Sequence, residues 1–271
     1  MPFTVRAEEG KLWITPLDER SARRELVFKG TNWAGFQAHG CPHELWKHSV
    51  QEYVDFLRIH QFNAVRLPLS VPLTLENATA QPNHCGEYGG RPWLSVLDDV
   101  LDRLRVAGIF VVIDMHTISE PEAQDPLWHA NADTWDVVSD ERPLRDAWSV
   151  MADRYCASQP HVIGVDLFNE PYSSTWGASR GGGHDWASAA ERLGDHVLER
   201  CSRWLILVSG VADYSGDGCH DLGCCCPNIR GQLDRPLKLR HPGRLVLSPH
   251  VYGAFTHASN PSPQALTNTQ A

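Results

Sequence analysis

Polar side chains that could carry acid and base chemistry follow apolar segments of this chain. The clearest case is Asn169-Glu170-Pro171, which directly follows the apolar run 162–168. A carboxyl group beside an amide at the end of a buried strand can act as a general acid, and the proline stops the strand after it. A solvated loop glutamate is the plainer interpretation of so short a motif, so the other segment ends must be considered too.

Four further hydrogen-bonding side chains end other apolar segments. Arg66 closes one segment, His116 closes the next, and His250 and Tyr252 close a later one. An arginine in a strand needs a carboxylate opposite it, which could be catalytic or could form a structural ion pair. Either histidine alone could be a satisfied core residue. Because several apolar segments end in such polar side chains, one shared site is favoured.

The elements that would position these residues form a repeating pattern. Apolar runs bounded by turn signals predict buried strands at 26–33, 62–68, 109–116, 162–170, 204–210 and 244–252. Helical periodicity predicts helices at about 45–57, 94–104, 143–158 and 185–197, the last with Asp185 as N-cap. The helix after the fifth strand is weak, because 210–243 is rich in Gly, Pro and Cys.

Alternating strands and helices predict an α/β fold, the (β/α)8 TIM barrel, in which chemistry lies at the carboxyl ends of the strands. A doubly wound open sheet is the alternative, but no Gly-x-Gly-x-x-Gly follows the first strand. We expect the barrel over residues 1–253, a hairpin at about 3–28 capping its floor, and a loop or disordered tail at 254–271. Six strands of eight are found, so we expect a C-terminally truncated barrel.

Composition restricts the partners of the chain. Its 271 residues carry 24 Lys+Arg against 33 Asp+Glu, a formal net charge of -9, so no broad basic surface is available for nucleic acid or an anionic membrane. The longest apolar run, 106–113, is about half of what a bilayer span needs. We expect no nucleic-acid or membrane partner and a monomer.

The compartment stays open at this point. The N-terminus shows no positive region followed by an apolar stretch, whereas 8 Cys is a high count for a reducing cytosol. Cys41 and Cys85 fall in two loops that a barrel would bring together. The run from Cys219 to Cys226 could suggest zinc, but three adjacent cysteines lack the paired spacing of a tetrahedral site, so disulfides or free thiols are preferred there. We expect no metal and no cofactor.

Several segments together resemble glycoside hydrolase family 5, the cellulase family, and in particular its endo-1,4-glucanase-like members. The resemblance covers about residues 10–253. The matching segments are 29–36, 63–68, 114–116, 162–171 and 248–252, with further likeness at 127–128, 189–194 and 214–217.

The resemblance implies a retaining glycosidase acting on a β-linked polysaccharide, with Glu170 as acid/base. In such a site Asn169 would bind the sugar 2-hydroxyl, Arg66 and Tyr252 would orient the nucleophile, and His116 and His250 would line the sugar subsite. Three tryptophans in loops after the first, third and fourth strands could stack on sugar rings: Trp33, Trp128 and Trp176. The choice among cellulose, mannan, xylan and other glycans stays open.

The chain departs from the family in one respect that matters for catalysis. The resemblance implies a nucleophilic Glu ending a seventh strand, but no Asp or Glu follows Tyr252. Asp114 and Asp166 are interpreted as buried structural groups, and Asp213 and Asp217 as solvated loop residues.

Three hypotheses about function are carried forward. The first is an endo-β-1,4-glucanase, and the second is a catalytically inactive chain that binds carbohydrate weakly or not at all. The third, a barrel enzyme such as an aldolase, is disfavoured because no Lys ends a strand.

Overall fold

The computed structural model describes residues 3–18, 22–119, 125, 127–131, 136–177, 184–211 and 229–250. The strands are β1 (Phe3–Glu8), β2 (Lys11–Pro16), β3 (Arg24–Glu25), β4 (Gly30–Asn32), β5 (Ala64–Ser70), β6 (Phe110–Thr117), β7 (Val162–Asp166), β8 (Leu205–Ser209) and β9 (Leu245–Ser248). The α-helices are α1 (Phe36–His39), α2 (Val50–Ile59), α3 (Val71–Glu76), α4 (Trp93–Val106), α5 (Val137–Asp140), α6 (Arg142–Tyr155) and α7 (Trp186–Arg200). Two short 3-10 helices are η1 (Gly86–Tyr88) and η2 (Arg230–Gln232).

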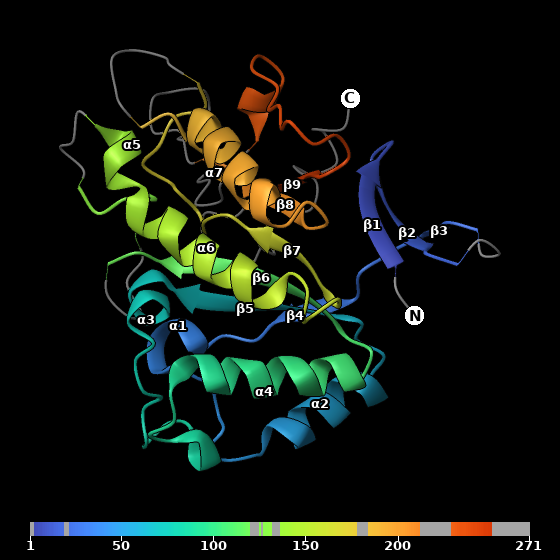
Figure 1. Cartoon of the computed structure of the whole chain (residues 1–271), viewed down its shortest axis with the longest axis vertical. Helices are drawn as coiled ribbons and strands as arrows, with labels where there is room; N and C mark the ends of the chain where they lie inside the picture. The colour runs from blue at the N-terminus through green and yellow to red at the C-terminus, as the bar shows by residue number, and fades with distance from the viewer. Residues whose placement is uncertain are drawn as a thin grey trace, which may run out of the picture.

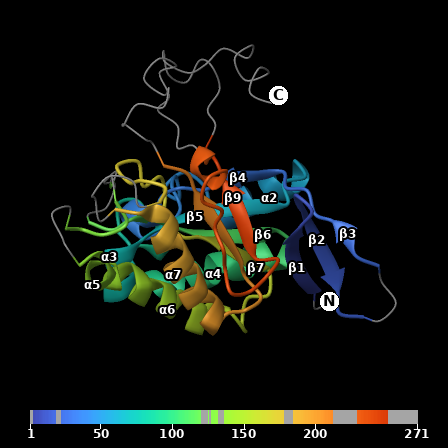
Figure 2. The same cartoon turned by 90° about the horizontal axis from the view of Figure 1, so that it is seen from above.

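Six parallel strands form the central sheet, in the order β4-β5-β6-β7-β8-β9 (Figure 1). Each strand pairs with the one that follows it along the chain, which is the strand order of a barrel wall. Helices α4, α6 and α7 lie along one side of this curved sheet (Figure 2). The structure is therefore a parallel half-barrel, and it confirms the α/β class and the six predicted strands.

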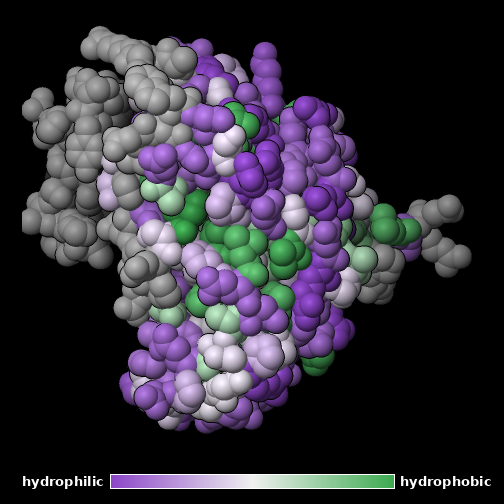
Figure 3. Space-filling view, turned by 60° about the vertical axis from the view of Figure 1, so that its left-hand side comes forward, coloured by the Kyte–Doolittle hydropathy of each residue, from purple (hydrophilic) through white to green (hydrophobic). Residues whose placement is uncertain are grey.

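The predicted helices are present because their apolar faces are buried, and two of them, α2 and α7, have side-chain caps at their amino ends. Helix α2 begins at a capping box between Ser49 and Glu52. Helix α7 begins after Asp185, whose side chain accepts a hydrogen bond from the Ser188 amide, so the predicted N-cap is confirmed. Seen from the side that lies at the left in Figure 1, the surface is mostly hydrophilic, with apolar side chains gathered near its centre (Figure 3).

The first strand is shorter than predicted. Only Gly30–Asn32 pairs in the parallel sheet, whereas Leu26 and Phe28 pack into a small apolar cluster with the N-terminal hairpin. That cluster includes Ile163 and Leu205 at the amino ends of β7 and β8. Leu26 and Phe28 thus pack at the floor of the half-barrel, whereas Val27 between them is exposed.

The hairpin of β1 and β2 lies at this floor. The two strands pair antiparallel, and β3 adds a short third strand. The ring of Phe3 meets that of Phe110 edge-on at 5.6 Å between centroids. The amide of Ala7 donates to the Gly243 carbonyl at 3.0 Å, which ties the hairpin to the chain just before β9.

Two disulfides each join neighbouring strand-helix units. Cys41 pairs with Cys85, as the barrel topology predicts for their two loops. Cys156 pairs with Cys201 and joins the carboxyl ends of α6 and α7, a bond that the sequence reading did not single out.

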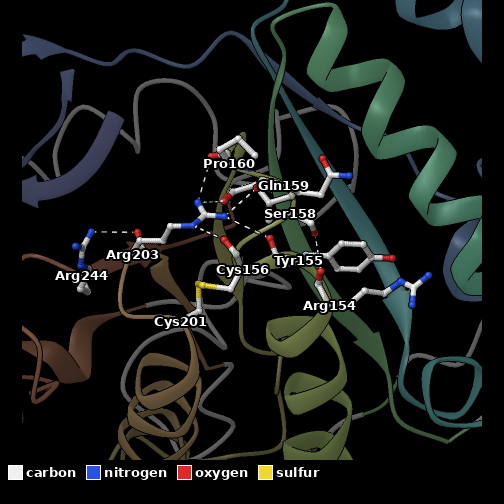
Figure 4. Close-up of a disulfide and its surroundings, with 10 residues drawn as sticks. Arg154, Tyr155, Cys156, Ser158, Gln159, Pro160, Cys201, Arg203 and Arg244 are labelled. Carbon is white, nitrogen blue, oxygen red and sulfur yellow. Dashed lines mark hydrogen bonds between the residues drawn. A yellow bond between two sulfur atoms is a disulfide. The ribbon is translucent and has the colours of Figure 1, made fainter. Parts of the chain in front are cut away.

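A half-buried arginine lies beside the second disulfide (Figure 4). The guanidinium of Arg203 donates to backbone carbonyls at the end of α6 and in the turn after it: Tyr155, Cys156, Gln159, Pro160 and Val162. The Arg203 carbonyl in turn accepts from Arg244 at 3.1 Å. Burial, and then the neighbouring charge of Arg244, lower the pKa of Arg203 to about 10. A cation at the carboxyl end of a helix also complements the helix dipole.

Several predictions fall on residues that the structure does not describe. These are Tyr252, the tail 254–271, the cysteine run 219–226, and the loop residues Asp213 and Asp217. Within the described ranges, no helix is both long and apolar enough to cross a bilayer.

Replacing Arg203 by lysine should destabilise the fold by about 1–2 kcal/mol, because one ammonium cannot donate to five carbonyls; those of Tyr155 and Gln159 keep backbone amide donors, whereas the others would lose the guanidinium. The free energy of unfolding in urea would measure this. Arg200→Lys is the matched control, since Arg200 pairs only with exposed Asp153 in the described part of the chain. If both variants lost the same small amount of unfolding free energy, the proposed contribution of Arg203 to stability would be contradicted.

A buried histidine should make the fold sensitive to acid. Burial, and then the charges of Arg105 and Arg203, lower the pKa of His161 to about 4. An unfolded histidine titrates near 6.5, so below that pH the unfolded chain binds the proton more readily and stability falls down to about pH 4.

Between pH 7 and pH 5, His161 should therefore account for about 2 kcal/mol of lost stability. Urea unfolding at both pH values should show this loss in the wild type and in the exposed control His60→Gln, and a smaller loss in His161→Gln. The same acid loss in all three proteins would argue against the assignment.

Candidate active site

An ion-pair cluster around Arg66 joins three neighbouring strands. The prediction that Arg66 closes its strand is wrong, because Arg66 is the third residue of β5 and the strand continues to Ser70. Arg66 is on β5, Asp114 is on β6 and Asp166 ends β7. Nη2 of Arg66 lies 3.0 Å from Oδ1 of Asp114 and 2.9 Å from Oδ2 of Asp166. Both carboxylates are fully buried. The expectation that Asp114 and Asp166 are buried structural groups is confirmed, and they are the partners that the sequence demanded for Arg66.

The cluster contains two carboxyl groups and one guanidinium, and their proximity shifts the pKa values of Arg66 and Asp166. Burial opposes the charge of Arg66, but Asp114 and then Asp166 outweigh it and raise the pKa of the guanidinium. Burial raises the pKa of Asp166 to about 6, with Arg66 acting against it and Asp114 adding to it. The cluster therefore favours the charged form of Arg66 and disfavours two full negative charges beside it.

Two further predicted residues are tied to the same cluster. His116 contacts Asp114 through its Nδ1, 2.7 Å from Oδ2. The side-chain Oδ1 of Asn169 accepts a hydrogen bond from Arg66 at 3.1 Å. The backbone N–H of Asn169 donates to the Met115 carbonyl on β6. The structure thus brings Arg66, His116 and Asn169 together, with His116 and Asn169 near the carboxyl ends of β6 and β7 and Arg66 reaching them from within β5.

Glu170 follows in an unusual backbone conformation. Its φ of 48° is in the left-handed region, which a residue with a side chain adopts at a cost of about 1–3 kcal/mol. Its amide donates to Oγ of Ser209 at 3.3 Å, and its carbonyl accepts from the Tyr172 amide at 2.6 Å. These bonds hold a turn that would otherwise relax, and such strain is concentrated at functional sites.

The carboxyl group of Glu170 contacts an imidazole. Oε1 lies 2.6 Å from Nδ1 of His250, which follows β9. Glu170 is 8% exposed, so this contact is largely screened from water. The negative charge of Glu170 also helps to raise the pKa of Arg66, so the two pairs act on each other electrostatically.

The three predicted stacking residues differ in their surroundings. Trp33 is half-buried, its amide donates to the Arg66 carbonyl at 2.9 Å, and its ring lies 5.4 Å from that of Tyr53. Trp176 is also half-buried, with its indole N–H on the Arg235 carbonyl at 3.0 Å and its ring against Gly231.

The prediction for Trp128 is wrong. Its side chain is 0% exposed, its indole N–H donates to Glu141 at 3.2 Å, and its ring packs at 5.3 Å from that of Trp186. A ring enclosed on both faces cannot stack on a sugar. The loop position of Trp128 did not reveal that a buried carboxylate would accept its N–H.

Two residues near the site were not predicted. Ser209 ends β8 and anchors the Glu170 backbone, and its own carbonyl accepts from Trp186. Asn32 ends β4, 3.4 Å from Nη1 of Arg66 through Oδ1. Both follow the same rule that identified the other candidates, since each is a polar side chain at the end of a strand. Among the described residues, no group of three or more potential ligands could hold a metal.

Comparison with known proteins agrees with this arrangement. The family model of cellulase (glycosyl hydrolase family 5) matches residues 25–271. An endoglucanase of Paenibacillus polymyxa is 32% identical over 238 residues, which are 85% of this chain and 57% of that protein. The major extracellular endoglucanase of Xanthomonas campestris is 32% identical over 244 residues, 84% of this chain and 46% of that protein. The chain thus spans about half the length of these relatives.

Solved structures are similar to this chain in both fold and sequence. The cellotetraose complex of a variant endocellulase from Pyrococcus horikoshii superposes with a TM-score of 0.80 at 25% identity, over 99% of this chain and 76% of that one. The catalytic domain of the Xanthomonas campestris endoglucanase gives a TM-score of 0.73 at 30% identity, over 87% and 67%. With the family model covering nearly the whole chain, this protein belongs to glycosyl hydrolase family 5, the cellulase family.

Proposed function

We propose that this chain carries the acid/base half of a retaining β-glucan hydrolase that cleaves internal β-1,4 bonds, with Glu170 as the acid/base. The observation that supports this most directly is the Glu170–His250 pair at the carboxyl edge of the sheet, 2.6 Å apart and largely screened from water. The names of the related endoglucanases and the cellotetraose bound by a solved relative support the substrate class.

The reaction would proceed in two steps. In the first, a carboxylate attacks the anomeric carbon while Glu170 gives its proton to the departing glycosidic oxygen, which leaves a glycosyl-enzyme ester. In the second, Glu170 takes a proton from water, and the resulting hydroxide displaces the carboxylate with net retention at the anomeric carbon.

The remaining residues would bind the sugar. Asn169 lies next to Glu170 and is held by Arg66, which suits a hydrogen bond to the 2-hydroxyl of the cleaved residue. His116 and His250 offer ring nitrogens at the same edge, and Trp33 and Trp176 keep part of their rings open to a pyranose.

The described residues do not identify the second carboxylate, which would act as the nucleophile. Asp114 and Asp166 lie nearby, but both are fully buried and ion-paired with Arg66, so neither can reach an anomeric carbon. This observation favours a second candidate function for the chain by itself, namely the binding of a β-glucan chain without cleavage.

The two functions can be separated with the 271-residue chain. We expect it to bind cellotetraose in calorimetry and to release no shorter sugars, because no carboxylate among the described residues is placed for attack. Trp33→Ala should weaken binding, whereas Trp13→Ala on the hairpin should not. Cleavage with retention by this chain would show that the nucleophile is among its own residues.

Glu170→Gln tests the acid/base role in a chain extended by a seventh strand that ends in Glu. We expect kcat/KM on a soluble β-1,4-glucan to fall by about 10²- to 10⁴-fold. The loss should be much smaller on a dinitrophenyl cellobioside, because dinitrophenolate departs without being protonated. Glu76→Gln on exposed α3 is the matched control. Equal losses on both substrates would mean that Glu170 is structural.

A further inference from the structure

We propose that Asp114 is a positioning residue that holds two residues of the candidate site at once, Arg66 and His116, and determines which ring nitrogen of His116 meets the sugar. The inference rests on the proposed function for the identity of the ligand only. The arrangement of the three side chains stands without it.

The geometry places Asp114 at the centre of the cluster. Oδ1 lies 3.0 Å from Nη2 of Arg66 in an ion pair, and Oδ2 lies 2.7 Å from Nδ1 of His116. Asp114 and His116 are two positions apart on β6, so their side chains leave the strand on the same face. The carboxylate is 0% exposed and the His116 side chain is 28% exposed, so the contacts run from the interior to the solvent-accessible side of the sheet edge.

Donor and acceptor chemistry then decides the state of the imidazole. A carboxylate can only accept, so Nδ1 must carry the hydrogen in this contact. In the neutral ring Nε2 is left as the acceptor, and no hydrogen bond occupies it within the described ranges. His116 therefore offers a fixed acceptor to a sugar hydroxyl.

A shared carboxylate also couples two contacts that would otherwise be independent. Arg66 reaches Asn169 through the same Nη2 that faces Asp114. Movement of Asp114 would therefore disturb the placement of both His116 and Asn169. Asp166 does not share this double role, because its Oδ2 accepts two bonds from Arg66, whereas the described contact with His116 is made by Asp114; Oδ1 of each aspartate accepts no hydrogen bond in the described structure.

The first test uses nitrogen NMR of the wild-type chain, with the His116 ring signals assigned by their loss in His116→Gln. We expect the neutral ring to be in the Nδ1–H form. A neutral ring in the Nε2–H form would overturn the proposal without any Asp114 variant being made.

Asp114→Asn gives the second test through an inversion. Arg66 only donates, so the new amide oxygen should face Arg66 and the amide nitrogen should donate to Nδ1 of His116, which forces the ring into the Nε2–H form. An unchanged tautomer would overturn the proposal. Asp153→Asn, which alters an exposed ion pair with Arg200, should leave the tautomer as in the wild type.

Calorimetry with cellotetraose completes the experiment. Asp114→Asn should weaken binding by about tenfold, because the sugar hydroxyl then meets a donor where it had an acceptor. Asp153→Asn should bind like the wild type. Unchanged affinity in Asp114→Asn would overturn the positioning role, whereas a wild type that binds no cellotetraose would contradict the proposed function and leave the tautomer result intact.

Discussion

The largely buried guanidinium of Arg66 is the interaction on which the candidate site depends, because it joins neighbouring strands that share no covalent connection there. Its contacts reach Asn32 on β4, Asp114 on β6 and Asp166 on β7. A buried cation is tolerated only when carboxylates compensate it, and here two of them do. Removing one partner would leave a charge in the interior, so the relative positions of these strand ends are strongly constrained.

The strained turn at Glu170 is built against this rigid background. A glutamate with φ of 48° needs surroundings that prevent relaxation, and the bonds from Ser209 and Tyr172 supply them. His250 then meets the carboxyl group from the far edge of the sheet. Residues from β7, β8 and β9 therefore converge on one side chain, in a way that strand-by-strand packing alone would not require.

Much of this arrangement could be predicted from the sequence, because parallel strands are nearly continuous apolar runs and their polar ends meet at one edge. Arg66, His116, Asn169 and Glu170 were found by that rule. The choice of partners could not be predicted in the same way. Only the packed sheet shows that Arg66 takes both Asp114 and Asp166.

The remaining differences have local causes. Trp128 is enclosed because its N–H finds Glu141, and a loop position says nothing about such an acceptor. Cys156 and Cys201 meet because the carboxyl ends of α6 and α7 are adjacent, which depends on helix packing. Strand β4 is shorter than predicted because apolar side chains before Gly30 pack at the floor of the half-barrel and do not extend the strand. The hairpin bonded to Gly243 also implies an order of folding. The strands of the sheet pair only with their neighbours along the chain, so each unit can join the growing sheet soon after it leaves the ribosome. The hairpin is made first, yet its bond from Ala7 to Gly243 and its apolar contact with Leu205 need segments synthesised some 200 residues later. The first element to be synthesised is therefore among the last to reach its final place.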